Sequence, residues 1–224
     1  MKPKVWLALG GEAVVFALLL FGVADTVRWG GAWLFLVVFF GAALLITLRL
    51  ARDDPALLDE RMKPLAQKDQ PLWDRLVLTF MFLAFIGWLV LMALDARHGW
   101  SSVPVALQLL GAIGVAVAMA ICGSAFRANT FLAPVVRIQQ ERAQTVVSTG
   151  PYAVLRHPMY AGALLLFLAT PLNLGSWWGL AGSGVLGLGL VVRTALEDRE
   201  LHRRLAGYPE YATRVRWRLL PRVW

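Results

Sequence analysis

The residues best suited to chemistry lie in one short run in the second half of the chain. The run is Gly150-Pro151-Tyr152, followed by Arg156-His157-Pro158-Met159-Tyr160-Ala161-Gly162. Gly-Pro is a turn signal, and Pro158 suits the first position of a helix, where its missing N–H costs nothing. Arg156 and His157 are therefore expected just before a helix whose free N–H groups favour an anion. Gly162, two positions after Tyr160, lets a ligand or a neighbouring helix come close.

A second group of charged residues follows the last long apolar run: Arg193, Glu197, Asp198, Arg199 and Glu200. Arg193 and Glu197 are four positions apart, so they share one face of a helix. One interpretation is a solvated helical face with the ion pairs Arg193–Glu197 and Glu200–Arg204. The other is a binding site for a charged ligand next to the Arg-His run.

The remaining polar features of the sequence favour structural roles. Glu12 lies inside the first apolar run and must face the helix bundle or a polar cavity, and a packing hydrogen bond is the favoured interpretation. The alternating Arg and Trp residues of 216–224 favour a segment in the membrane interface over nucleic-acid binding. The single cysteine, Cys122, is expected to pack as a small apolar residue. The sequence contains no P-loop, no metal-ligand cluster and no dinucleotide glycine fingerprint.

The composition indicates that lipid surrounds the elements that position these residues. Of the 224 residues, 58% are hydrophobic and only 16% are charged, whereas soluble domains are about a quarter charged. Apolar runs long enough, or nearly long enough, to cross a bilayer core of about 30 Å can be marked at Val5–Ala24, Gly31–Leu50, Leu76–Leu94, Val103–Gly123, Tyr160–Leu174 and Trp177–Val192. The last two are joined by a tight turn and predict a helical hairpin. The polar connection 51–75 is expected to hold one short helix.

The distribution of positive charge predicts the orientation in the membrane. Of the 22 Lys and Arg residues, only Arg28 and Arg97 fall on one side when both termini are placed on the other. Cytoplasmic connections carry the excess of Lys and Arg, so six spans with both termini in the cytoplasm are expected. The fold class predicted is therefore an all-α, polytopic integral membrane bundle. Residues 1–125 would form its N-terminal helices, and 126–224 the catalytic half with a cytoplasmic C-terminal segment.

The motif run, the hairpin and the acidic pair Glu197-Asp198 together resemble the isoprenylcysteine carboxyl methyltransferase family. Related phospholipid methyltransferases share this pattern. The resemblance covers the chain from Phe126 to Trp224, and the earlier residues match only as apolar spans. Members usually carry Glu-Glu where this chain has Glu197-Asp198.

The resemblance implies a membrane enzyme that binds S-adenosylmethionine in a cytoplasmic pocket beneath the C-terminal segment. It implies Arg193 and Glu197 as catalytic residues, and a cofactor set of Arg156, His157, Tyr160, Gly162, Glu197 and Asp198. The chemistry of the cofactor agrees, because its carboxylate favours a helix start with a cation such as Arg156 or His157. Its ammonium favours a carboxylate such as Glu197. The acceptor would be lipophilic or membrane-associated, and a prenylated cysteine carboxylate, a phospholipid amine and a small thiol all fit the motif.

Two other functional classes fit parts of the same pattern. Membrane sterol reductases, which use NADPH, resemble this family over the same region. The Gly-Pro-Tyr lead-in and the acidic pair after the hairpin favour the methyltransferase. A non-catalytic membrane adaptor on the same scaffold is disfavoured because the site residues are all present.

Overall fold

The computed structural model describes residues 3–67 and 69–224, and all of its regular elements there are helices. The α-helices are α1 (Pro3–Ala24), α2 (Gly30–Asp53), α3 (Pro55–Arg61), α4 (Leu72–His98), α5 (Val105–Ala128), α6 (Pro158–Leu174), α7 (Trp177–Arg204) and α8 (Tyr208–Arg214). Two short 3-10 turns, η1 (Gln140–Arg142) and η2 (Gly150–Ala153), lie in the connection between α5 and α6. The predicted all-α bundle is confirmed.

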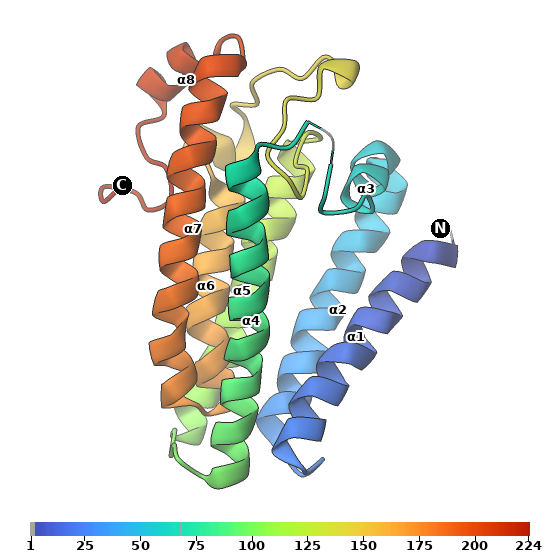
Figure 1. The fold of residues 1–224 in the computed structure, drawn as a ribbon, viewed down its shortest axis with the longest axis vertical. Coiled ribbons are helices and arrows are strands. Elements are labelled where there is room, and N and C mark those ends of the chain that lie inside the picture. Colours follow the sequence, from blue (N-terminus) through green and yellow to red (C-terminus); the bar gives the residue numbers. More distant parts are fainter. Residues whose placement is uncertain (1–2, 68) are drawn as a thin grey trace.

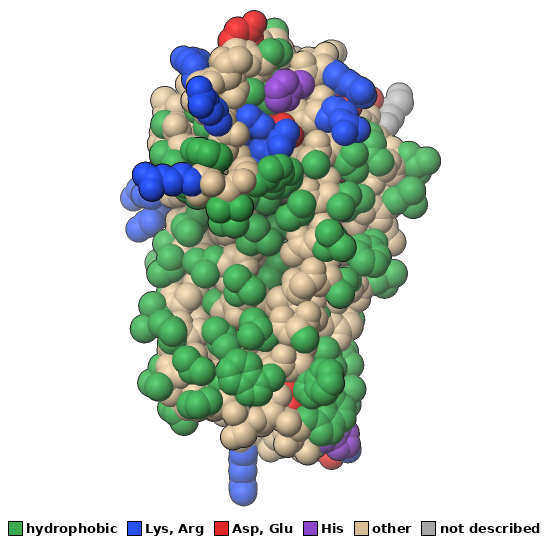
Figure 2. All heavy atoms as spheres, turned by 90° about the vertical axis from the view of Figure 1, so that its left-hand side faces the viewer, with side chains coloured by type: hydrophobic (Ala, Val, Ile, Leu, Met, Phe, Trp, Pro, Cys, Tyr) green, Lys and Arg blue, Asp and Glu red, His purple; other side chains and the backbone are tan. Residues whose placement is uncertain are grey.

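Five helices, α1, α2, α4, α5 and α7, are long and apolar enough to cross a membrane, and α6 is a shorter apolar helix of 17 residues. On the face shown in Figure 2, hydrophobic side chains form a broad middle zone, and Lys and Arg side chains gather mainly at one end. This is the surface expected of a protein that a bilayer surrounds. Which end faces the cytoplasm stays a prediction.

The helices α4 to α7 form a close group, and α1 and α2 lie to one side of it (Figure 1). Toward the end that carries α3, these two helices diverge from α4 (Figure 1). The closest packing is between α5 and α6, where Gly111 and Gly162 have neighbours that leave little room for a side chain. A Cβ added at Gly111 would lie 2.4 Å from the backbone nitrogen of Asn173.

The predicted hairpin of the last two spans forms between α6 and α7. Gly175 ends α6 with a positive φ of 79°, and the hydroxyl oxygen of Ser176 caps α7 by accepting from the N–H of Gly179 at 2.8 Å. The helix α7 continues past the apolar run that ends at Val192 and reaches Arg204, as the shared helical face expected for Arg193 and Glu197 requires. Its charged last turns remain helical and are supported by the expected Glu200–Arg204 pair, at 3.0 Å.

The polar connection 51–75 contains the expected short helix. Asp54 caps α3, and its carboxylate accepts from the N–H of Leu57 at 3.0 Å. This helix lies at the same end of the bundle as the start of α6, the end of α7 and α8 (Figure 1). The chemically interesting residues are therefore all at one end.

Candidate active site

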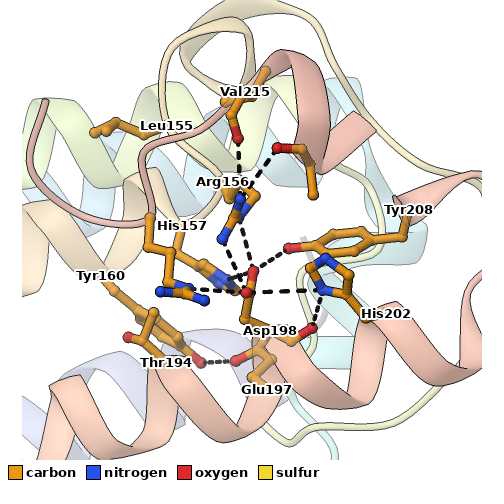
Figure 3. A network of polar contacts seen from close by, with 12 residues as sticks. Leu155, Arg156, His157, Tyr160, Thr194, Glu197, Asp198, His202, Tyr208 and Val215 are labelled. Atoms are coloured by element: carbon orange, nitrogen blue, oxygen red, sulfur yellow. Dashed lines mark hydrogen bonds and ion pairs between the residues drawn. The ribbon is translucent and has the colours of Figure 1, made fainter. Parts of the chain in front are cut away.

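The start of α6 and the end of α7 bring Tyr160 and Glu197 together, because the two helices are antiparallel neighbours. The Tyr160 hydroxyl donates to Glu197 Oε2 at 2.6 Å (Figure 3). The ring of His157 stacks on the ring of Tyr160 with centroids 5.7 Å apart. Residues up to 40 positions apart in sequence thus form one polar group at the end of the bundle.

Asp198, the next residue after Glu197, is the centre of a separate buried network (Figure 3). Arg156 Nη2 and Arg218 Nε donate to its Oδ2 at 3.0 and 2.9 Å. The hydroxyl of Tyr208 donates to its Oδ1 at 2.9 Å, and His157 Nε2 lies 3.4 Å from the same atom. Only 2% of Asp198 is exposed, so both carboxylate oxygens are occupied by the protein itself.

Arg156, which was predicted to bind an anion, also has its polar atoms bonded within the protein. Its Nη1 donates to the carbonyl oxygens of Ala212, Val215 and Arg216 at 3.2 to 3.4 Å. Its own N–H donates to the carbonyl of Trp217 at 2.9 Å. Arg156 therefore fixes the C-terminal segment to the start of α6.

Arg193 does not form the considered ion pair with Glu197. Its Nε donates to Asp74 at 3.0 Å and its Nη2 donates to the carbonyl of Pro134 at 3.0 Å. Its guanidinium lies over the ring of Tyr160, 5.4 Å from the centroid. Glu197 is one turn nearer the C-terminal end of α7 than Arg193, and there the Tyr160 hydroxyl reaches it. Arg193 instead lies beside Asp74 of α4.

Gly162 packs against α5 and not against a ligand cavity. A Cβ added there would lie 2.8 Å from Cys122 Sγ and 3.0 Å from the carbonyl of Ala118. Gly162 was expected to let either a ligand or a neighbouring helix come close, and the atoms around it belong to the neighbouring helix α5.

A cavity of about 770 Å³, including its mouth, opens beside Tyr160 and Glu197. Small-molecule sites are typically clefts lined by apolar and aromatic side chains with a few polar groups, as here. Its lining includes four residues of the predicted site, Arg156, His157, Tyr160 and Glu197. Arg193, Asp198 and Gly162 are not among the residues that line it.

Most of the remaining lining comes from residues that sequence reasoning missed. Tyr152 and Met159 of the motif run also line the cavity. The connection after α5 contributes one wall, and aromatic and aliphatic residues near the end of the chain contribute another: Asn129, Phe131, Leu132, Ala133, Val135, Val136, Arg137, Gln144, Thr145, Val146, Val147, Leu201, Leu205, Tyr208 and Tyr211. The length of the connection was the one signal that could have pointed to it. Burial raises the pKa of the Tyr211 hydroxyl in this wall to about 12.

Ion pairs hold the connection after α5 in place over the cavity. Arg137 Nη2 lies 2.7 Å from Glu60 Oε1 in α3 and 2.7 Å from Glu141 Oε1. Burial acts to raise the pKa of Glu60, but hydrogen bonds from Lys63 and Arg137 outweigh it and hold the pKa below its ordinary value. The cavity wall is therefore tied to α3.

The cavity offers the two kinds of group that an amino-acid ligand needs. Glu197 supplies a carboxylate for an ammonium. Met159 lies in the first turn of α6, where backbone N–H groups lack helical acceptors and attract an anion. Among residues 3–67 and 69–224, no three His, Cys, Asp or Glu side chains lie close enough to hold a metal ion.

Residues 104–204 match the model of a family described as phospholipid methyltransferase. The predicted relationship to phospholipid methyltransferases is confirmed over these residues. A comparison with curated proteins finds no match to the chain.

Proposed function

We propose that this chain, whose residues 104–204 match the phospholipid methyltransferase family, transfers a methyl group from S-adenosylmethionine to a lipophilic acceptor. The family and the apolar helices together indicate a membrane methyltransferase. The cofactor, the site residues and an acceptor of the isoprenylcysteine carboxyl methyltransferase type are the proposed part.

The observation that carries the proposal is the Tyr160–Glu197 pair at the wall of the cavity. Glu197 would hold the ammonium of the cofactor, and Tyr160, at 2.6 Å, fixes the direction of the carboxylate. His157, stacked on Tyr160, and the N–H of Met159 would face the cofactor's carboxylate. Arg156 and Asp198 would support the site by holding the C-terminal segment, since their polar atoms are already bonded within the protein.

Methyl transfer requires little of the protein beyond holding the two reactants in the correct position. S-adenosylmethionine, when bound, supplies an electrophilic methyl group on a positively charged sulfur. The residues here would hold the cofactor and exclude water, so that the acceptor's lone pair meets the methyl carbon in line. Arg193 is paired with Asp74 and does not line the cavity, so it would act on the acceptor only through Tyr160, whose ring centroid lies 5.4 Å from its guanidinium.

The test is cofactor binding by calorimetry on the detergent-purified protein. Glu197→Gln should weaken binding of S-adenosylmethionine by about 1.5–3 kcal/mol, the value of a hydrogen bond to a charged group. Glu200→Gln is the matched control, because Glu200 is on the same helix but pairs with Arg204. Unchanged affinity in Glu197→Gln, or binding of NADPH in place of S-adenosylmethionine, would overturn the proposal.

The acceptor can then be identified directly. The purified protein is incubated with methyl-labelled S-adenosylmethionine and a total lipid extract, and the labelled product is characterised. A labelled lipid is expected, and it should be absent when Tyr160→Phe/Glu197→Gln replaces the unaltered protein. Label found only in water-soluble products would contradict a lipophilic acceptor.

A further inference from the structure

A second cavity lies between α2 and α5, at the end of the bundle that carries α3. It encloses about 780 Å³, including its mouth, and its lining includes Arg49 and Ile46 of α2 and Arg127 and Gly123 of α5. The two helices pack closely here, because a Cβ added at Gly123 would lie 3.2 Å from Cγ1 of Ile46. Ile46 and Gly123 are one turn farther from the helix ends than the two arginines, so the cavity has a charged mouth and an apolar floor.

The two arginines of this cavity have no partner in the protein. Arg49 and Arg127 are both exposed, and neither guanidinium makes a hydrogen bond or an ion pair in the part of the chain that the structure describes. The two carboxylates that also line the cavity are held by other groups: Asp53 accepts from Arg52 at 2.6 Å, and Asp54 caps α3. Two cations are therefore available to one ligand.

The arginines lie at the depth of lipid phosphates. At 1.5 Å per residue, Arg49 is about 28 Å along α2 from Gly30, and Arg127 is about 33 Å along α5 from Val105. The hydrocarbon core of a bilayer is about 30 Å thick, so helices that begin at one face of the core bring these side chains to the other face. In the orientation predicted from the charge distribution, this is the cytoplasmic face. Basic pockets between helices on that side bind anionic lipid head groups.

A buried apolar cluster separates this cavity from the candidate active site. Leu50, Leu57 and Phe126 form the cluster, and Leu50 and Phe126 also line the second cavity. Met159, which packs against the cluster, lines the cavity beside Tyr160. Among the described residues, none lines both cavities. A lipid head bound between α2 and α5 is thus not placed to receive a methyl group.

We propose that the cavity between α2 and α5 binds one anionic phospholipid that is not the acceptor of the reaction. Its phosphate pairs with Arg49 and Arg127, since a guanidinium matches phosphate oxygens with two parallel hydrogen bonds. Its acyl chains begin at Ile46 and Gly123. An anionic head is preferred over a zwitterionic one because the neighbouring carboxylates are already held within the protein.

The bound lipid supports both attachments of the active-site wall. The end of α2 leads into α3, which holds the connection after α5 through the Glu60–Arg137 pair at 2.7 Å. The end of α5 leads into that connection directly, and Asn129, two positions after Arg127, already lines the cavity beside Tyr160. A phosphate between Arg49 and Arg127 therefore joins the two segments that hold the wall.

The test counts bound lipids by native mass spectrometry. The full chain in detergent is incubated with equal amounts of phosphatidylglycerol and phosphatidylcholine that carry the same acyl chains, and we expect one retained phosphatidylglycerol. Arg49→Gln and Arg127→Gln should each weaken its retention by about fivefold, the effect of one basic side chain near anionic lipid. Arg49→Gln/Arg127→Gln should abolish the preference, and Arg49→Lys/Arg127→Lys, which keeps both charges, should retain most of it. Both side chains are exposed, so the variants should fold, which circular dichroism checks.

The matched control is Arg203→Gln/Arg214→Gln. It removes two charges from exposed side chains at the same end of the bundle but outside the cavity, and it should keep the preference. Loss of the preference in this control would show that the whole basic surface attracts the lipid, and would overturn the inference. Equal retention of phosphatidylethanolamine, displacement of the lipid by soluble glycerol phosphate, or a preference kept in Arg49→Gln/Arg127→Gln would also overturn it. The assay contains no S-adenosylmethionine, so its outcome is independent of the proposed function.

Discussion

Arg193 and Asp74 form a buried ion pair across 119 positions of sequence, with Nε and Oδ1 3.0 Å apart. Arg193 is 7% exposed and Asp74 is fully buried. Asp74 Oδ2 also accepts from the backbone N–H of Val136 at 3.0 Å, and Arg193 donates to the carbonyl of Pro134 at 3.0 Å. One pair thus joins α7, the start of α4 and the connection that lines the cavity.

Removing either member of this pair should destabilise the protein strongly. Arg193→Leu leaves the Asp74 charge buried without a cation, which lowers the free energy of unfolding by about 3–5 kcal/mol. Asp74→Leu should act in the same direction, and Asp74→Leu/Arg193→Leu should lose less than the two single variants added together. Denaturant unfolding in detergent micelles measures all three. Arg204→Ala, which removes an exposed pair, should cost under about 1 kcal/mol. Strictly additive losses would show that the pair is not coupled.

Asp198→Asn should loosen the C-terminal segment. The neutral amide keeps the shape of the side chain, but the charge that holds Arg156 and Arg218 is lost. Hydrogen–deuterium exchange over residues 215–224 should therefore become faster, with little change in the bilayer-spanning parts of α4 and α5. Glu200→Gln, two positions along the same helix, is the control. If exchange is unchanged and cofactor affinity falls instead, Asp198 contacts the cofactor as the sequence resemblance implied.

The elements of the fold were predictable because each has a local signal. Apolar runs gave the spans to within a few residues at most ends, and Asn173 to Ser176 marked the hairpin turn. The apolar run Trp177–Val192 covers only part of α7, and the spacing of the charged residues after it indicated that the helix continues, as it does to Arg204. Hydrophobic composition indicates which part of a helix is surrounded by lipid. In α7 the apolar part ends before the helix does, so the end of the apolar run is not the end of the helix.

The partners of the site residues were not predictable from the sequence. The motif run contains Tyr160 and the acidic pair contains Glu197, and the structure places the two side chains 2.6 Å apart; their role as a site stays a prediction. Nothing local says that Asp74 pairs with Arg193, or that Tyr208 and Arg218 occupy Asp198. Such pairs depend on how helices that are far apart in sequence pack against each other. A charged residue that is close in sequence is only one of several possible partners for a given charge. The packing hydrogen bond expected for Glu12 does not form among residues 3–67 and 69–224, and the sequence could not show this for the same reason.

Acid should weaken the attachment of the cavity wall to α3. Because the pKa of Glu60 is held below its ordinary 4.5 in the folded protein, its ion pairs stabilise the fold fully above that value. This contribution is lost as the pH falls through the lower folded pKa. Unfolding measured from pH 6 to pH 3 should show stability falling below about pH 4.5, and Glu60→Gln should flatten that part of the curve. Glu210→Gln, which removes an exposed carboxylate, should leave it unchanged. A Glu60→Gln profile that parallels the unaltered protein would contradict the role of this pair.

The contact between α5 and α6 should tolerate no side chain at Gly111. A Cβ there would lie 2.4 Å from the backbone nitrogen of Asn173 and 2.8 Å from the carbonyl of Ala169. Backbone atoms cannot turn aside, so the two helices must separate, and overpacking of this kind costs about 1–3 kcal/mol or more. Gly11→Ala is the matched control, because nothing lies within 4 Å of its Cβ and alanine favours a helix by about 1 kcal/mol. Thermal unfolding in detergent should therefore separate the two variants clearly, with Gly111→Ala below the unaltered protein and Gly11→Ala at or above it. Equal midpoints would mean that α5 and α6 do not approach each other as described, and the placement of Tyr160 at the start of α6 would have to be revised with them.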